Sequence, residues 1–423
     1  MNKKLLLILL LALGFRLISL NQSLWLDEGI QWWAVTTFPL KHLITEYIKG
    51  DFNPPLFHAI LYFWVRIFGD SEIALRLPSV LFGVGTVFFT YKLGGVKAAL
   101  LTATAPLLIY YSQEARMYSL AAFTATATLY FLTKKSKFYF IPAIFMLYSH
   151  YLTWLFIPLL SPWLLLFLIP WLPVFWLQLS QGLGAATNPA WAGLSALSTK
   201  NILLVPIKFF IGRLPVEANF FYALLLFIPL CLAVYLIFKA KNKLLYAWAF
   251  LPLVLGAIIS LKIPVFTYFR FLFVLPAVYL LLVQGAAKSK YPNLFIGIFV
   301  GLNLLTASRY LLDANMHRED WRSATTYIHS QPAPVIIYSA VRSPFEYYDR
   351  GVSLQISETN LDQLINQPAV WYISYAQPIF DSGQKVAATL TQLGFQEVSQ
   401  RSFRSVTVLR YENPDSRLYS MNY

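Results

Sequence analysis

Long apolar stretches recur along this chain from the N-terminus to about residue 311. Each holds about 20 residues, the length that an α-helix needs to cross the hydrocarbon core of a bilayer. Hydrophobic residues make up 58% of the 423 positions and charged residues only 12%, whereas a soluble domain carries roughly 25% charged residues. The sequence therefore predicts an α-helical polytopic membrane protein.

Lysine residues cluster in the short segments between the apolar stretches. The clusters are Lys3-Lys4, Lys92 with Lys97, Lys134-Lys135 with Lys137, Lys239 with Lys241 and Lys243, and Lys288 with Lys290. Cytoplasmic loops of membrane proteins carry such an excess of basic residues. The net charge of +14 is thus explained by membrane orientation, so we expect membrane lipids and no nucleic acid as partners.

The side of the membrane on which each lysine cluster lies constrains the number of spans. An even number of spans must separate any two cytoplasmic loops. Counting 55–68 as a span would place Lys92 and Lys97 outside, so we expect an amphipathic helix there at the outer interface. Asn53 would cap this helix, and His58 would face lipid headgroups. The expected spans, about 11 in number, are 5–20, 74–91, 98–111, 117–132, 138–150, a short pair within 151–179, 219–238, 244–261, 269–284 and 291–311.

The C-terminal tail differs in composition from the apolar part. Short β-rich runs at 335–338 and 370–373 alternate with helical patterns at 320–330 and 383–393, which indicates a small α/β domain. We expect a transmembrane domain over 1–314, with interfacial helices in the first outer loop (21–73), and an extracytoplasmic α/β domain over 315–423. The N-terminus would be cytoplasmic, in a cell (plasma or inner) membrane.

Two adjacent carboxylates, Asp27 and Glu28, lie in the first outer loop beside Trp25. Acids favour the first turn of a helix, where they complement its dipole, and this plain explanation stays open. The functional alternative is a general base next to an acid that positions substrate. Because neighbours in a helix point about 100° apart, the two acids would have different tasks.

Further polar residues lie at the predicted outer ends of spans. Each has a structural explanation, such as headgroup contact for an arginine or an interfacial ion pair. A cation at this height also suits a lipid-linked phosphate. Acids and arginines at one interface favour transfer of a group from an anionic lipid carrier, with arginines stabilising the departing phosphate. The candidates are Arg76, Glu114, Arg116, His150, Tyr151 and Arg270.

Taken in order, these motifs resemble the polytopic glycosyltransferases of the GT-C fold. The resemblance is to bacterial and archaeal family 39-like members, which are similar to protein O-mannosyltransferases and lipid A aminoarabinose transferases. One departure is Asn53, at a position where many relatives have histidine. The matching segments are 25–28, 53–56, 68–72, 74–79, 111–118, 149–151, 268–270 and 318–322.

The resemblance implies an inverting transfer of a sugar from a polyprenyl-phosphate donor to a lipid, glycan or protein acceptor on the outer face. Asp27 matches the general base, and Glu28 matches an acid that helps hold acceptor or sugar. Arg76 matches an arginine near the donor phosphate, where Arg270 and Arg116 are further candidates. Additional substrate contacts are expected from Asn53, Glu114, His150 and Tyr151.

No cofactor is expected, and the sequence lacks a cluster of Cys or His with metal-ligand spacing, so nothing in it supports a divalent cation. The alternative function is a lipid-linked sugar flippase or transporter. A transporter should place its ionisable residues near mid-membrane, whereas the acids here lie in a loop, which favours the enzyme. A non-catalytic assembly partner that works through its tail is a further alternative.

Cysteine-accessibility labelling checks the predicted orientation. In a variant with Cys231 replaced, cysteines at positions 27 and 58 and in the tail should label from outside, and those at 92 and 97 from the cytoplasm. The reason is the excess of basic residues in cytoplasmic loops. Labelling of position 58 from the cytoplasm alone would overturn the interfacial helix.

Overall fold

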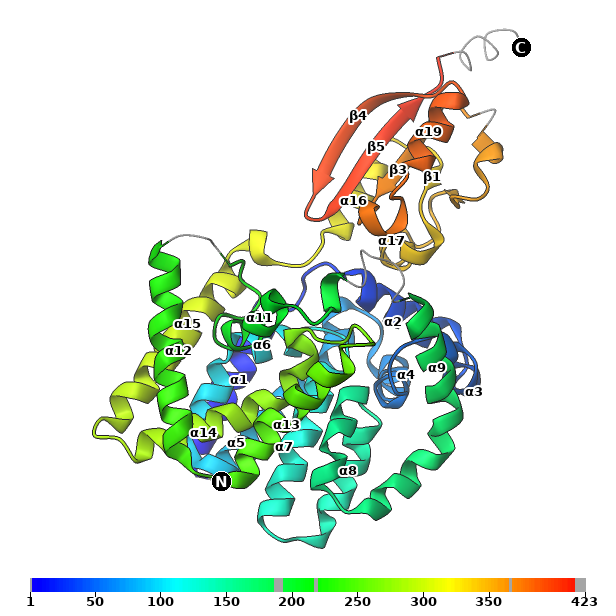
Figure 1. Ribbon diagram of the computed structural model, residues 1–423. Coiled ribbons are helices and arrows are strands. Elements are labelled where there is room, and N and C mark those ends of the chain that lie inside the picture. Colours follow the sequence, from blue (N-terminus) through cyan, green and yellow to red (C-terminus); the bar gives the residue numbers. More distant parts are fainter. Residues whose placement is uncertain (1, 186–192, 217–219, 365–366, 415–423) are drawn as a thin grey trace. The chain divides into compact units, whose positions relative to one another are not determined.

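The structure is a computed structural model that describes all residues except 1, 186–192, 217–219, 365–366 and 415–423 (Figure 1). It divides into two compact units. Unit 1 contains Met1–Leu20 and Phe38–Met316, and unit 2 contains Asn21–Thr37 and His317–Tyr423. Residues 21–37 thus group with the C-terminal tail. The domain boundary expected between residues 314 and 315 stays a prediction.

Unit 1 is helical wherever its described residues form regular structure. Its elements are α1 (Lys3–Leu17), α3 (Leu40–Thr45), η1 (Tyr47–Gly50), α4 (Leu56–Phe68), α5 (Glu72–Thr104), α6 (Pro106–Ser112), α7 (Tyr118–Thr133), η2 (Lys137–Tyr139), α8 (Phe140–Leu147), η3 (Tyr151–Leu159), η4 (Pro162–Trp171), α9 (Leu172–Ala185), α11 (Thr199–Ile211), α12 (Phe220–Ala240), α13 (Lys243–Ile259), η5 (Tyr268–Val274), α14 (Leu275–Ala287), α15 (Pro292–Leu312) and η6 (Ala314–Met316). Helices therefore occupy the described parts of the expected spans.

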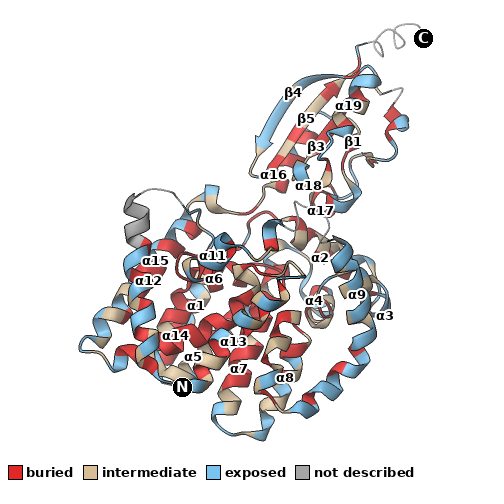
Figure 2. Ribbon diagram, viewed as in Figure 1, coloured by how far each residue is buried: buried red, intermediate tan, exposed pale blue. Residues whose placement is uncertain are grey.

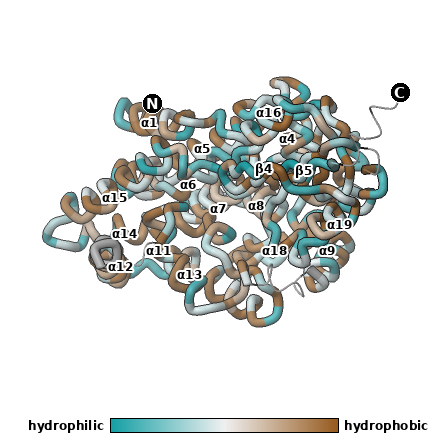
Figure 3. The backbone as a smooth tube through the Cα atoms, turned by 90° about the horizontal axis from the view of Figure 1, so that it is seen from above, coloured by the Kyte–Doolittle hydropathy of each residue, from teal (hydrophilic) through white to brown (hydrophobic). Residues whose placement is uncertain are grey.

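Within the described residues, four helical segments are long and apolar enough to cross a membrane, namely Glu72–Thr104, Pro162–Gly184, Tyr268–Ala287 and Pro292–Leu312. Hydrophobic residues predominate along α13, α14 and α15, which are largely brown in Figure 3. The chain is accordingly an α-helical polytopic membrane protein. The number of crossings stays a prediction.

The long helix α5 contains a reversal at Gly95, whose φ of 72° and ψ of −161° are not helical. Val87 lies before this residue and Ala103 after it, and both belong to one buried cluster with Ile8 and Ala12 of α1. In a continuous helix, Val87 and Ala103 would lie about 24 Å apart. The chain therefore folds back between Lys92 and Lys97, where the sequence predicts the turn between two spans.

Two pairs of the predicted cytoplasmic clusters meet in unit 1. Asn2, next to the first cluster, donates a hydrogen bond from Nδ2 to the Tyr91 hydroxyl (3.4 Å), beside the second. Lys288 Nζ donates to the carbonyl of Ala240 (2.7 Å), within the fourth. Each pair therefore shares one end of the bundle, as the parity argument requires. The side of the membrane that this end faces stays a prediction.

Ala105 separates α5 from α6, so the helical hydrogen-bond pattern is interrupted at this residue. Pro106 has no N–H, and the last carbonyls of a helix lack partners within it. Buried side chains supply donors: Arg16 Nη1 reaches the carbonyl of Ala103 (3.3 Å), and Asn303 Nδ2 reaches that of Leu101 (3.3 Å). These hydrogen bonds connect α1 and α15 to the C-terminal end of α5.

The end of α1 is held in the same way. Gln113 Nε2 donates to the carbonyls of Arg16 (3.1 Å) and Ile18 (2.6 Å), and the hydroxyl of Tyr310 donates to Gln113 Oε1 (2.9 Å). Arg16 Nε also donates to the hydroxyl of Ser112 (3.0 Å). Part of the polar motif at 111–118 therefore has a structural task, which is to satisfy the backbone at the end of α1.

Unit 2 combines α2 (Leu26–Thr37) with a five-stranded sheet of order β2-β1-β3-β5-β4. Strand β1 pairs in parallel with β2 and β3, and β5 pairs antiparallel with β3 and β4. Its other elements are α16 (Trp321–His329), β1 (Val335–Ile336), η7 (Ser339–Val341), α17 (Ser343–Asp349), β2 (Gln355–Ile356), η8 (Leu361–Leu364), β3 (Ala369–Ser374), α18 (Gln377–Phe380), α19 (Lys385–Gln392), β4 (Gln396–Phe403) and β5 (Val406–Glu412). The predicted small α/β domain is confirmed.

Both faces of this sheet are covered at β3, whose residues are mostly buried (Figure 2). Successive side chains of a strand point to opposite faces. Trp371 belongs to a core with Trp321 of α16 and Leu26 of α2, whereas Tyr372 belongs to a second core with Leu390 of α19. The first outer loop therefore contributes to the hydrophobic core of unit 2.

Close packing of α12 on α14 generates a prediction for stability. A Cβ at Gly285 would lie 1.9 Å from the carbonyl oxygen of Leu236, so Gly285→Ala should force the helices apart. We expect a loss of about 1–3 kcal/mol, read as a lower Tm in detergent. Gly301→Ala in α15 is the control, since its Cβ would meet no atom within 4 Å. Equal melting temperatures would contradict this packing.

Candidate functional site

A half-buried carboxylate and a buried histidine form one part of the candidate site in unit 1. Asp51 Oδ2 lies 3.1 Å from His58 Nε2, and Asp51 Oδ1 accepts a hydrogen bond from Asn53 Nδ2 (2.8 Å). His58 is 3% exposed, so it does not face headgroups as the sequence predicted. Asn53 does not cap α4 either, because its side chain is bonded to Asp51.

The positive charge of Arg116 interacts electrostatically with both Asp51 and His150. Burial alone raises the pKa of the Asp51 carboxyl, but the contact with His58 and the charge of Arg116 outweigh burial and hold that pKa well below its usual range. The positive charges of Arg270 and Arg116 both act on His150. The structure thus brings Arg116, Arg270 and His150 together, and a site role for them stays a prediction.

Aromatic rings pack around these polar groups. Tyr118 lies 5.9 Å from the His150 ring and 5.5 Å from the Phe269 ring, and Tyr111 lies 5.0 Å from Tyr118, all between centroids. These contacts join α6, α7, η5 and the turn before η3. They hold the 111–118 and 268–270 motifs beside each other, although the motifs are far apart in sequence.

Two basic residues that the sequence analysis did not select join this aromatic group. Arg213 Nη1 donates to the Tyr268 hydroxyl (2.7 Å), and its guanidinium lies 5.3 Å from the Tyr110 ring centroid. Lys208 Nζ lies 5.8 Å from the Tyr268 ring centroid. Lys208 lies in α11 and Arg213 shortly after it, and their positive charge was the available signal. Four cations near aromatic rings suit an anionic ligand.

Other selected residues of unit 1 have structural contacts. Arg76 is fully buried, and its Nη1 donates to the carbonyl of Leu20 (2.8 Å). Tyr151 contacts Gln178 through its hydroxyl, which also accepts from Trp171 Nε1 (2.9 Å). Glu114 is 1% exposed, and its charge acts on Tyr111 and Tyr268. Substrate roles for these residues stay predictions.

The acidic pair belongs to unit 2. Asp27 is half-buried in the first turn of α2, and Glu28 is fully buried, with its Oε2 4.0 Å from Nε of Arg318. Successive helical residues point in different directions, so one acid reaches the surface and the other the interior. The two acids thus differ in their surroundings, while their expected tasks stay predictions. A contact of Glu28 with substrate stays a prediction.

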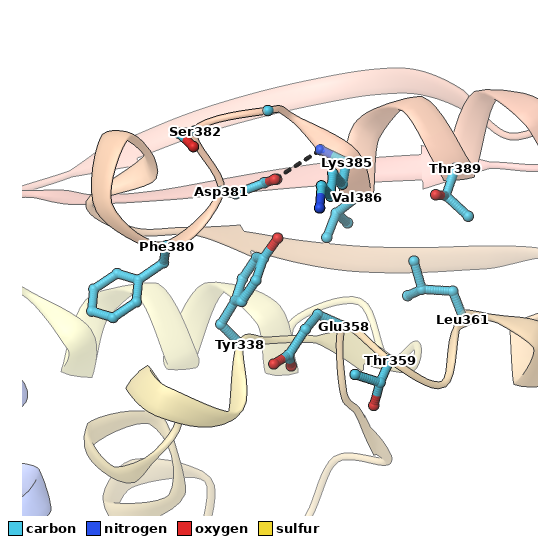
Figure 4. A pocket seen from close by; sticks show the side chains of 11 residues that line it. Tyr338, Glu358, Thr359, Leu361, Phe380, Asp381, Ser382, Lys385, Val386 and Thr389 are labelled. Carbon is cyan, nitrogen blue, oxygen red and sulfur yellow. Dashed lines mark hydrogen bonds between the residues drawn. The ribbon is translucent and has the colours of Figure 1, made fainter. Parts of the chain in front are cut away.

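A separate cavity of about 350 Å³ lies where the parallel strands of unit 2 end (Figure 4). Its wall includes Tyr338, Glu358, Phe380 and Asp381. Both carboxylates are used within the domain: Asp381 Oδ1 accepts from the N–H of Lys385 (2.7 Å), drawn dashed in Figure 4, and Glu358 Oε2 accepts from the N–H of Ser339 (3.0 Å). These bonds stabilise the loops that follow the strands.

A metal site has no donor set in the part of the chain that the structure describes, where no three His, Cys, Asp or Glu side chains lie close enough to hold an ion. The cations of unit 1 instead offer guanidinium and ammonium groups, which bind phosphate directly.

Comparisons with known proteins identify the fold. No protein-family model matches the chain, and no curated protein matches it. The crystal structure of ArnT from Cupriavidus metallidurans bound to undecaprenyl phosphate matches 96% of this chain and 97% of that one, with a TM-score of 0.51 and 13% identity. The apo state of the same protein matches with equal coverage, a TM-score of 0.50 and 12% identity. The chain therefore has the fold of ArnT, a lipid A aminoarabinose transferase of the GT-C fold, as the resemblance in its motifs predicted.

Proposed function

We propose that the chain is an inverting membrane glycosyltransferase that moves a sugar from a polyprenyl-phosphate donor to an acceptor on the outer face of the membrane. The observation that carries this proposal is the likeness, over 96% of the chain, to a transferase solved with undecaprenyl phosphate bound. The group of cations and aromatic rings in unit 1 supports it independently, because its chemistry suits a phosphate.

In this proposal, Arg270 and Arg116 neutralise the donor phosphate. Arg270 is half-buried in η5, and its Nη1 donates to the carbonyl of Pro264 (3.3 Å). Arg116 is 8% exposed. Guanidinium groups in a partly dry environment hold phosphate oxygens by paired hydrogen bonds and stabilise the charge that develops as the sugar departs. Arg76 remains a further candidate for the phosphate.

Asp27 is proposed as the general base. An acceptor hydroxyl oxygen forms a bond to the anomeric carbon from the face opposite the phosphate, and the bond from that carbon to the phosphate oxygen breaks. The lipid phosphate leaves with the bonding electrons, and the Asp27 carboxylate takes the hydroxyl proton. Its half-buried position on α2 leaves part of the carboxylate accessible to an acceptor.

A direct assay separates the enzyme from the transporter alternative. Purified protein in detergent is incubated with a panel of polyprenyl-phosphate sugars and candidate acceptors, and mass spectrometry reads the products. Release of lipid phosphate with transfer of the sugar supports a transferase. Movement of an intact lipid-linked sugar across vesicles, with no bond broken, would support a flippase and overturn the proposal.

The phosphate role of Arg270 predicts a loss of donor affinity. Arg270→Ala should weaken donor binding by about 1.5–3 kcal/mol, the range for a lost charge-assisted hydrogen bond. Arg270→Lys should also weaken it, because an ammonium lacks the bidentate fork. Titration with a polyprenyl-phosphate sugar measures both, with Arg66→Ala as the control, since Arg66 is exposed on α4. Unchanged affinity in both variants would remove Arg270 from the phosphate site.

The base role of Asp27 predicts a selective loss of turnover. Asp27→Asn keeps the shape and removes the basicity, so kcat should fall by about 10²–10⁴ while donor affinity and expression stay near the parent values. Asp362→Asn, at an exposed position of unit 2, should keep full turnover. If Asp27→Asn also keeps it, the proton acceptor is another group.

A further inference from the structure

The C-terminal tail contacts the first outer loop along its whole approach to α2. The Oε1 of Gln22 accepts from the N–H of Arg318 (3.3 Å), and the hydroxyl of Ser23 accepts from the N–H of Arg322 (3.2 Å). The N–H of Leu24 donates to the hydroxyl of Tyr348 (2.8 Å). All of these residues belong to unit 2. The loop therefore reaches α2 already fixed to the tail.

One tail residue, Glu319, contacts the beginning of α2 directly. Its Oε2 accepts a hydrogen bond from the N–H of Leu26 (3.1 Å), the first residue of the helix. The first N–H groups of a helix have no partner within it, and a negative charge is favourable at this end of the helix dipole. A residue about 290 positions away in sequence thus acts as a cap for the helix that carries Asp27.

The Glu319 carboxylate is itself held in place from two other directions. Trp321 Nε1 donates to Oε2 (2.7 Å), and the Tyr375 hydroxyl donates to Oε1 (2.6 Å). Trp321 is fully buried, and its ring centroid lies 5.2 Å from that of Tyr375. An ionised carboxylate accepts all three hydrogen bonds. Such a fully bonded group has little freedom to move.

The middle of α2 is also held in place, by close packing against α17. A Cβ at Gly29 would lie 2.6 Å from the backbone nitrogen of Pro344, so only glycine permits this approach of α2 to α17. The Trp32 and Tyr347 rings meet edge to face with centroids 5.0 Å apart. Through these contacts the tail determines how α2 is rotated about its axis. It therefore also determines the direction in which residue 27 points.

We propose that Glu319 is a positioning residue for Asp27, which it orients by accepting the first helical N–H of α2 while Tyr375 and Trp321 hold the Glu319 carboxylate. The C-terminal domain is then a working part of the transferase. The catalytic consequence rests on the proposed function, whereas the structural consequence does not.

Charge supports the same assignment. Burial raises the pKa of Glu319, and the charge of Asp27 adds to this increase, while the three hydrogen bonds oppose it. The charge of Asp27 acts on both Glu319 and Tyr375 of the tail, while Oε2 of the neighbouring Glu28 lies 4.0 Å from Nε of Arg318. Removing the charge of Glu319 removes repulsion between two carboxylates.

Three variants of the full chain in detergent test the proposal. Glu319→Gln replaces the acceptor that three donors require and removes its charge. Tyr375→Phe keeps the ring and removes one donor to Glu319. Glu397→Gln is the control, because Glu397 accepts from the Tyr411 hydroxyl (3.4 Å), a similar bond on the other core of the sheet.

The first measurement is amide hydrogen exchange of residues 24–32, which needs no activity. Exchange in the first turn of α2 should accelerate in Glu319→Gln, and less in Tyr375→Phe, while Glu397→Gln matches the parent. If Glu319→Gln fails to fold, Tyr375→Phe decides the outcome. Unchanged exchange in the folded variants would overturn the positioning role, whether or not the protein is a transferase.

The second measurement is the pH dependence of lipid-phosphate release. Glu319→Gln should lower kcat by about 10²-fold, the cost of a misplacement near 1 Å, with donor affinity unchanged. The acid limb of its profile should move to lower pH, because a neutral amide no longer repels a carboxylate at position 27; a general loss of folding would not produce this shift. A parent without lipid-phosphate release would instead refute the proposed function and leave the exchange result standing.

Discussion

Satisfaction of backbone polar groups inside an apolar bundle is the constraint on which unit 1 depends. Hydrocarbon offers no hydrogen bonds, so each break in a helix must find donors within the protein. Arg16 and Asn303 supply them at the break before Pro106, and Gln113 and Arg76 supply them after α1. Four buried polar side chains thereby determine where the helices α1, α5, α6 and α15 meet.

This constraint also explains the composition of the motif at 111–118. Ser112 and Gln113 satisfy the backbone and the guanidinium of Arg16, whereas Arg116 acts on Asp51 and His150. Structural and candidate binding residues therefore alternate within a few positions. A polar motif beside a span serves both purposes, since residues that close a helix end also lie where the chain reaches the membrane surface.

The proposed chemistry is divided between the two units. The cations suited to a donor phosphate, Arg116 and Arg270, belong to unit 1, and the proposed base, Asp27, belongs to unit 2 with the tail residues that hold its helix. The role proposed for Asp27 would therefore depend on the sheet domain, whose residues hold α2. This dependence gives the tail motif at 318–322 a physical function, because Arg318 and Glu319 contact α2 directly.

Apolar periodicity and lysine placement were enough to determine the membrane class, the bounds of most helices and the turn between Lys92 and Lys97. The short β-rich runs also predicted β1 and β3 within the tail. These features are local, since the length of an apolar stretch and the charge of a loop are properties of contiguous residues. The order of the motifs further predicted the GT-C fold, which the likeness to ArnT confirms.

Tertiary structure alone decided which motifs meet. Nothing in the sequence near residue 26 indicates that its N–H is accepted by Glu319, or that His58 turns inward to Asp51 and away from headgroups. Lys208 and Arg213 likewise join the aromatic group only through the packing of α11 beside η5. The physical reason is the distance along the chain between the residues that meet. A hydrogen bond between residues 26 and 319 depends on how the sheet and the helices pack, and local sequence patterns do not determine that packing.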